Sequence, residues 1–211
     1  RCAGLATAML LSRRGYRVLV VDRVTFPSDT VSIHVIQPLG VAALARWGLL
    51  ERMKATGCPP IHTYTFDFGP FTIAGSPGTT DAPVAYCPRR TVLDKLLVDA
   101  AADAGADVRE GFIVEDVVRE GDRVVGIRGR SRNGTAAEER AAVVVGADGR
   151  FSMVAQAVGA QQYHEKPPLL APYYTYWSDL PIDGHFDTYI RPHRGFAIAP
   201  TNDGLTLTVG G

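Results

Sequence analysis

The opening of the chain, RCAGLATAMLLSRRGYRVLVVD, joins a helix pattern to a strand pattern. Residues 3–14 are rich in alanine, leucine and methionine and end in a basic stretch before Gly15, which is typical of a helix and its stop. Residues 16–21 are long enough for one buried parallel strand, and Asp22 closes it. A helix followed by a buried strand belongs to an α/β architecture, so we predict that fold class.

The middle of the chain continues with helix and strand patterns. Helical spacing of apolar residues predicts helices over 35–53, after Pro38, and over 88–105. Short strands with a turn at residues 120–122 follow, and AAVVV at 141–145 predicts another buried strand. Proline, threonine and aromatic residues with alternating patterns instead indicate antiparallel strands within 58–86, and short alternating strands recur from Pro167 onward.

These segments predict two interleaved domains. The α/β domain would take residues 1–57 and 87–158, and a β-rich domain would take 58–86 and 159–211.

The composition narrows the range of partners. The chain has 22 basic and 22 acidic residues, and this balance provides no electrostatic surface for nucleic acid. No apolar run is long enough for a membrane span. The three cysteines and five histidines lack metal-ligand spacing, and scattered thiols are typical of a reducing compartment. We expect a cytoplasmic protein with a small-molecule substrate and no bound metal; the sequence sets no oligomeric state.

The opening also contains part of a dinucleotide fingerprint. In G-x-G-x-x-G, the third glycine permits close packing, and an acid about 20 residues later binds the ribose hydroxyls. Gly4 and Asp22 fit these two positions, whereas Arg1 stands where the second glycine is usual. The Arg1 guanidinium could instead meet a phosphate. The competing interpretation is a surface helix and a strand that are merely adjacent, and the opening alone leaves both open.

Two further motifs lie downstream. VVVGADGRFS, residues 143–152, places Asp148 and Gly149 after a predicted strand, where ligands of α/β sheets bind, although turn geometry alone would also explain its glycines. Arg90 begins the helix pattern R-x-x-L-[DE]-x-x-L, although a solvated basic pair with Arg89 is the simpler interpretation.

Taken in order, these motifs resemble the flavoprotein family of p-hydroxybenzoate hydroxylase, and more loosely its geranylgeranyl reductase and flavin-dependent halogenase relatives. The resemblance implies an incomplete Rossmann-like FAD-binding domain with an interleaved β-sheet substrate domain. It assigns the adenosine ribose to Asp22, the flavin side of FAD to Arg90, and the pyrophosphate and NAD(P)H use to Asp148 and Gly149. The full implied cofactor-binding set is Arg1, Cys2, Ala3, Gly4, Asp22, Arg23, Arg90, Asp148 and Gly149.

The resemblance also implies a function. We expect an FAD-dependent oxidoreductase, an NAD(P)H-dependent monooxygenase that hydroxylates a small organic substrate; no catalytic side chain is identified. The alternatives are an FAD-dependent reductase of isoprenoid-type double bonds and a non-catalytic fragment unable to bind FAD. The halogenase W-x-W-x-I-P box is absent from the sequence, which disfavours halogenation.

The resemblance raises two further expectations. It places Ser32, His34 and Gln37 near the flavin, although we favour a structural role for His34. The family's motif of Gly-Asp followed by a proline-containing helix start does not occur before Gly211, so we expect an internal piece of a longer protein that is inactive alone.

Overall fold

The computed structural model describes residues 1–167 and 171–211, and the chain forms two compact units. The first unit combines Arg1–Ser28 with Asp94–Glu165, and the second combines Asp29–Leu93 with Lys166–Gly211. The limits of these units differ from the predicted domain boundaries. The division into an FAD-binding domain and a substrate domain stays a prediction. No helix within the described ranges has both the length and the apolar character needed to cross a bilayer.

The first unit begins with the predicted helix and strand. Helix α1 spans Cys2–Ser12 and buries Leu5 and Met9, and β1 spans Leu19–Asp22. The strand starts later than predicted because Gly15 adopts a φ of +84° and the amide of Tyr16 bonds to the carbonyl of Leu11, which prolongs the turn after the helix.

Strand β1 pairs in parallel with β6, Asp107–Glu110. The register runs from Leu19 opposite Asp107 to Asp22 opposite Glu110. The helix that precedes β6 is α4, Arg90–Asp103, whose residues from Asp94 onward belong to this unit.

A three-stranded antiparallel sheet and a short helix complete the first unit. The sheet order is β7-β8-β9, with bounds Ile113–Glu120, Arg123–Arg130 and Ala136–Arg140. The predicted turn joins β7 to β8, where Gly121 has a φ of +58°. Helix α5 spans Met153–Ala157.

The prediction of a buried strand at 141–145 is wrong. This segment is irregular, and the side chains of Val143 and Val145 are 75% and 58% exposed. The amide of Ala141 bonds to the carbonyl of Val125, but no strand in the described part of the chain pairs with residues 142–145. A β-branched run favours extended backbone, yet a strand also needs a neighbour that accepts its hydrogen bonds.

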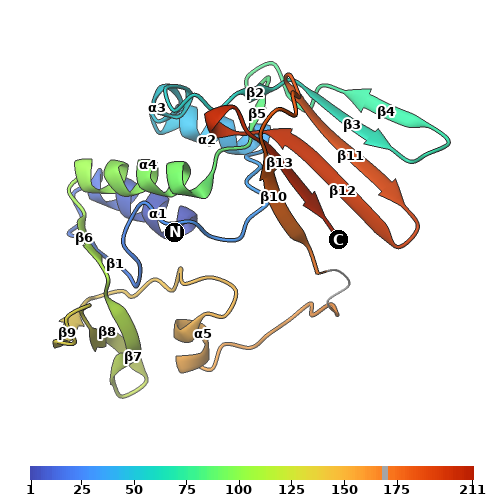
Figure 1. Cartoon of the computed structure of the whole chain (residues 1–211). Coiled ribbons are helices and arrows are strands. Elements are labelled where there is room, and N and C mark those ends of the chain that lie inside the picture. Colours follow the sequence, from blue (N-terminus) through green and yellow to red (C-terminus); the bar gives the residue numbers. More distant parts are fainter. Residues whose placement is uncertain (168–170) are drawn as a thin grey trace. The chain divides into compact units, whose positions relative to one another are not determined.

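The second unit is built on a six-stranded sheet with the order β10-β13-β12-β11-β3-β4 (Figure 1). Strand β3 pairs in parallel with β11, and the other neighbours are antiparallel. In chain order, the strands span Thr63–Asp67 (β3), Thr72–Gly75 (β4), Tyr173–Trp177 (β10), His185–Arg191 (β11), Arg194–Pro200 (β12) and Thr206–Gly210 (β13).

Short elements accompany this sheet. The predicted helix over 35–53 is in fact two helices, α2 (Pro38–Arg46) and α3 (Leu50–Lys54), because Gly48 takes a φ of +72° and ends the first. A two-stranded ladder, β2 (Pro60–Ile61) with β5 (Ala85–Tyr86), and the 3-10 helix η1 (Asn202–Gly204) complete the unit. One cluster of its buried core consists of Ile61, Ala85, Cys87, Ala199 and Leu207.

Candidate cofactor site

Asp22 lies at the carboxyl end of β1 in the first unit. This is the edge of a parallel pair at which ligands of α/β sheets bind. One carboxylate oxygen, Oδ1, accepts a hydrogen bond of 3.0 Å from the amide of Val24, which fixes the direction of the side chain. The side chain is 22% exposed, so a ligand can still reach it.

The N-terminus of α1 presents backbone amides. Arg1 is the N-cap residue, and Cys2, Ala3 and Gly4 form the first turn, where amides lack intrahelical acceptors. Such amides, together with the positive end of the helix dipole, suit an anion such as a phosphate. No side-chain hydrogen bond caps this helix.

Gly4 allows the GADG segment to approach α1 closely. A Cβ atom at Gly4 would lie 3.1 Å from the Cβ atom of Ala147, tighter than ordinary packing. The structure therefore brings two separate sequence motifs together in one unit. The close neighbour of Gly4 is this loop, whereas the fingerprint predicted packing against a strand.

The GADGRFS segment is organised around Asp148. Ser152 Oγ donates to Asp148 Oδ1 at 2.5 Å, and the Val154 amide donates to Oδ2 at 3.2 Å. Ser152 in turn caps α5 by accepting from the amide of Ala155 at 3.0 Å. Burial raises the pKa of Asp148, but the hydrogen bonds from Ser152 and the backbone outweigh it and leave the pKa below its usual value.

We predict that Asp148→Asn destabilises the first unit by about 1 kcal/mol at neutral pH, since the carboxylate supports a helix cap. Because the folded-state pKa lies below the unfolded value near 4, the contribution is complete above that value and is lost as the pH falls through the folded-state pKa. Urea unfolding as a function of pH tests this: the difference from wild type should shrink on acidification. Asp122→Asn, in the β7–β8 turn, is the control, and an equal effect there would contradict the prediction.

The remaining predicted residues are distributed over both units. Arg23 is exposed and lines an open cavity of about 560 Å³ in the first unit, together with Arg130 and Arg132. Arg90 is the first residue of α4 and belongs to the second unit.

Asp94 is the acidic position of the R-x-x-L-[DE]-x-x-L pattern, and it is a candidate site residue to which the sequence assigned no role. Its side chain is fully buried, and its Oδ2 lies 3.3 Å from Arg1 Nη1. The thiol of Cys2 donates to its other oxygen at 3.6 Å. A carboxylate on a helix beside the apolar residues Leu93 and Leu96 was the available signal, because a buried acid requires a partner.

His34 lies in the second unit, beside the partly buried Tyr174 and Tyr176. Its side chain is 3% exposed, and its backbone has a φ of +62°. Its Nε2 shares a hydrogen bond of 2.5 Å with Tyr176 Oη, and Tyr174 meets the His34 ring edge-on. Burial, with help from Asp29, raises the pKa of Tyr176 to about 12.

The other two residues expected near the flavin also have protein partners. Ser32 Oγ accepts from the His34 amide at 3.1 Å, and Gln37 Oε1 accepts from Tyr64 Oη at 2.8 Å. Each side chain thus has a structural role.

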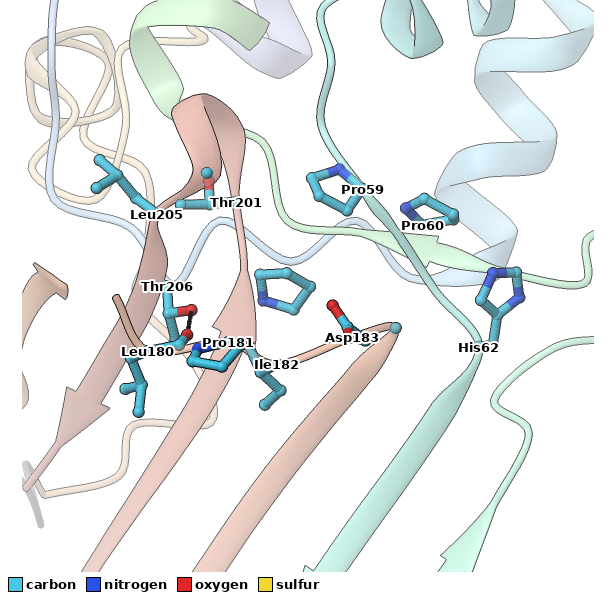
Figure 2. Close-up of a pocket in the computed structure, with 13 residues that line it drawn as sticks. Pro59, Pro60, His62, Leu180, Pro181, Ile182, Asp183, Thr201, Leu205 and Thr206 are labelled. Carbon is cyan, nitrogen blue, oxygen red and sulfur yellow. Dashed lines mark hydrogen bonds between the residues drawn. The ribbon is translucent and has the colours of Figure 1, made fainter. Parts of the chain in front are cut away.

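A separate open cavity of about 530 Å³ lies in the second unit (Figure 2). Prolines and aliphatic residues form much of its lining, and His62 and Asp183 are its ionisable members. Thr206 Oγ1 donates to the carbonyl of Leu180 across 2.6 Å at its wall. None of the predicted site residues lines this cavity.

Comparison with known proteins identifies the family. Residues 2–206 match the FAD binding domain family. The chain is 30% identical over 162 residues to 6-methylpretetramide 4-monooxygenase of Streptomyces rimosus, covering 74% of this chain and 28% of that protein.

Two solved structures share the fold over nearly the whole chain. The myxobacterial chondrochloren halogenase, an FAD-dependent halogenase, has a TM-score of 0.84 and 27% identity, covering 99% of this chain and 49% of that one. A geranylgeranyl bacteriochlorophyll reductase-like protein of Thermoplasma acidophilum has a TM-score of 0.78 and 20% identity, covering 99% and 53%. The chain thus spans about half the length of these solved relatives. The predicted fold class and flavoprotein resemblance are confirmed: the chain belongs to the FAD binding domain family.

Proposed function

We propose that the chain is the FAD-holding part of a monooxygenase that oxidises NAD(P)H and hydroxylates a small organic substrate. The observation that carries the proposal is the meeting, in the first unit, of the amide end of α1, the Asp22 carboxylate and the GADG segment. The 30% identity to a monooxygenase supports the reaction type.

The residues present fit FAD. The uncapped amides of α1 suit the pyrophosphate, and the Asp22 carboxylate can accept from the ribose hydroxyls. Gly4 leaves room where a side chain would crowd Ala147. We further propose that Asp148 and Gly149 lie near the pyrophosphate and that Arg90 contacts the flavin side.

The cofactor and the protein would have separate tasks in this proposal. When bound, FAD supplies the electron transfer and oxygen chemistry. The protein would hold the adenosine half through Asp22 and the first turn of α1, so that the flavin is placed reproducibly against the substrate.

We predict that Asp22→Ala in the full-length protein weakens FAD binding by about 10- to 100-fold, because hydrogen bonds to a charged acceptor contribute about 1.5–3 kcal/mol. The measurement is a titration of the apoprotein with FAD, in which the quenching of flavin fluorescence reports binding. Asp122→Ala is the control. Unchanged affinity in Asp22→Ala would reject the proposed ribose contact.

A second experiment separates the reactions. NAD(P)H oxidation by the full-length protein is followed with and without O2, and with added halide. Turnover that requires O2 and incorporates one oxygen atom supports hydroxylation, whereas O2-independent turnover favours a reductase. Halide-dependent product would favour a halogenase, which the 27% identity to one makes worth testing. A colourless protein that FAD does not stabilise would indicate a non-catalytic one.

A further inference from the structure

Asp94 is a fully buried carboxylate in the first unit. Removing such a charge from water is costly unless partners compensate for it. Arg1 lies 3.3 Å from one oxygen, and the Cys2 thiol donates to the other at 3.6 Å. Both partners belong to the start of α1, so Asp94 ties α4 to the end of α1 that carries the fingerprint.

Arg1 contacts a second carboxylate at the same time. Its Nε lies 3.5 Å from Asp22 Oδ2, while Nη1 faces Asp94. The guanidinium carbon lies 5.4 Å from the centre of the Phe26 ring, and the side chain is only 16% exposed. The fixed fork of a guanidinium can meet two acceptors at once, which the single ammonium of lysine cannot do with the same geometry.

These contacts determine how Asp22 is presented. The Val24 amide holds Oδ1, and Arg1 lies against Oδ2, so both oxygens of the carboxylate have a fixed direction. A carboxylate has about four lone-pair sites, and two remain for a ligand's hydroxyl groups. The sequence suggested a phosphate as the partner of Arg1, but the structure directs its guanidinium to two carboxylates.

We propose that Arg1 and Asp94 form a positioning pair that orients Asp22 for the adenosine ribose. The inference rests on the proposed FAD function and adds a role for Asp94. Asp94 anchors Arg1, and Arg1 orients Asp22. The arginine that replaces a fingerprint glycine therefore acts on the ribose end of the site through a neighbouring side chain.

The test uses the full-length apoprotein titrated with FAD and with an FAD analogue whose adenosine ribose lacks both hydroxyls. Asp94→Asn should weaken FAD binding about tenfold, but change binding of the analogue by about twofold or less, because Asp22 has no hydroxyl to accept from. Arg1→Lys, which keeps a positive charge beside Asp94, should behave in the same way. Asp99→Asn is the matched control, because Asp99 pairs with Lys95 at the surface of α4.

A double variant tests the coupling. In an Arg1→Gly background, Asp94→Asn should add little further loss of FAD affinity, because Asp94 then has no guanidinium to position. Circular dichroism of each variant is the check that it folds.

The experiment distinguishes failure of the positioning pair from failure of the proposed FAD function. If Asp22→Ala weakens FAD binding but Asp94→Asn does not, the positioning pair is wrong and the proposed FAD function stands. If Asp94→Asn weakens FAD and the analogue equally, Asp94 acts elsewhere on the cofactor and the inference is overturned. If Asp22→Ala has no effect, the ribose site itself is wrong.

Discussion

The Gly129→Ala variant should lower the free energy of unfolding of the first unit by about 3 kcal/mol. Gly129 lies in β8, and an ideal Cβ atom there would be 2.0 Å from the carbonyl oxygen of Ile113 and 2.9 Å from the ring of Phe112. The register shifts between Val114 and Asp116, beside this contact, and bulges favour such close backbone approaches. Because backbone cannot rotate away as a side chain does, β7 and β8 must separate.

Hydrogen exchange measured at each backbone amide is the most direct readout, since the two units need not unfold together. Amides of β7, β8 and β9 should lose protection. Gly75→Ala is the matched control: Gly75 also lies in a strand, but a Cβ atom there meets nothing within 4 Å. Equal protection in Gly129→Ala and wild type would show that the sheet absorbs the extra atom.

The Asn202→Leu variant should destabilise the second unit by about 3 kcal/mol, because it leaves two polar groups in the interior without a hydrogen-bond partner. The Asn202 side chain is 1% exposed. Its Oδ1 accepts from the Arg89 amide at 3.0 Å, and its Nδ2 donates to the Thr56 carbonyl at 3.0 Å. Leucine has a similar volume, so the loss comes from unmade hydrogen bonds.

Urea unfolding monitored by tryptophan fluorescence reports on this variant, since Trp47 and Trp177 both lie in the second unit. Asn133→Leu, in an exposed turn of the first unit, should leave this transition within about 0.5 kcal/mol of wild type. A normal midpoint for Asn202→Leu would mean that water replaces the lost hydrogen bonds.

Sequence patterns predicted local structure well where periodicity was strong. The opening helix and strand, the helix that begins at Arg90 and the turn at Gly121 all follow from spacing and stop residues. The prediction of a strand at 141–145 failed because the sequence pattern of this segment does not show whether a neighbouring strand is present to pair with it. The break at Gly48 was missed because a glycine inside a helical pattern can either be tolerated or end the helix.

The candidate site was only partly predictable for a different reason. Gly4 and Asp22 stand at fixed distances from each other along the chain, so a fingerprint can reveal them. Asp94 meets Arg1 from 93 residues away, and no spacing rule connects them. The contact of Gln37 with Tyr64 likewise depends on a residue distant in the sequence, whereas Ser32 bonds to the amide only two residues later.

The interleaving of the two units has a consequence for synthesis. Strand β1 emerges from the ribosome long before β6, and Arg1 and Asp22 are made long before Asp94. At about 5–20 residues per second, roughly 4–15 seconds separate the synthesis of Asp22 from that of Asp94, the buried partner of Arg1. During that interval, nascent chains would display an unpaired strand and an unanchored arginine. A nascent chain that has not reached residue 94 lacks both the parallel partner of β1 and the carboxylate that holds Arg1, so the proposed FAD site would be complete only after these later residues are made.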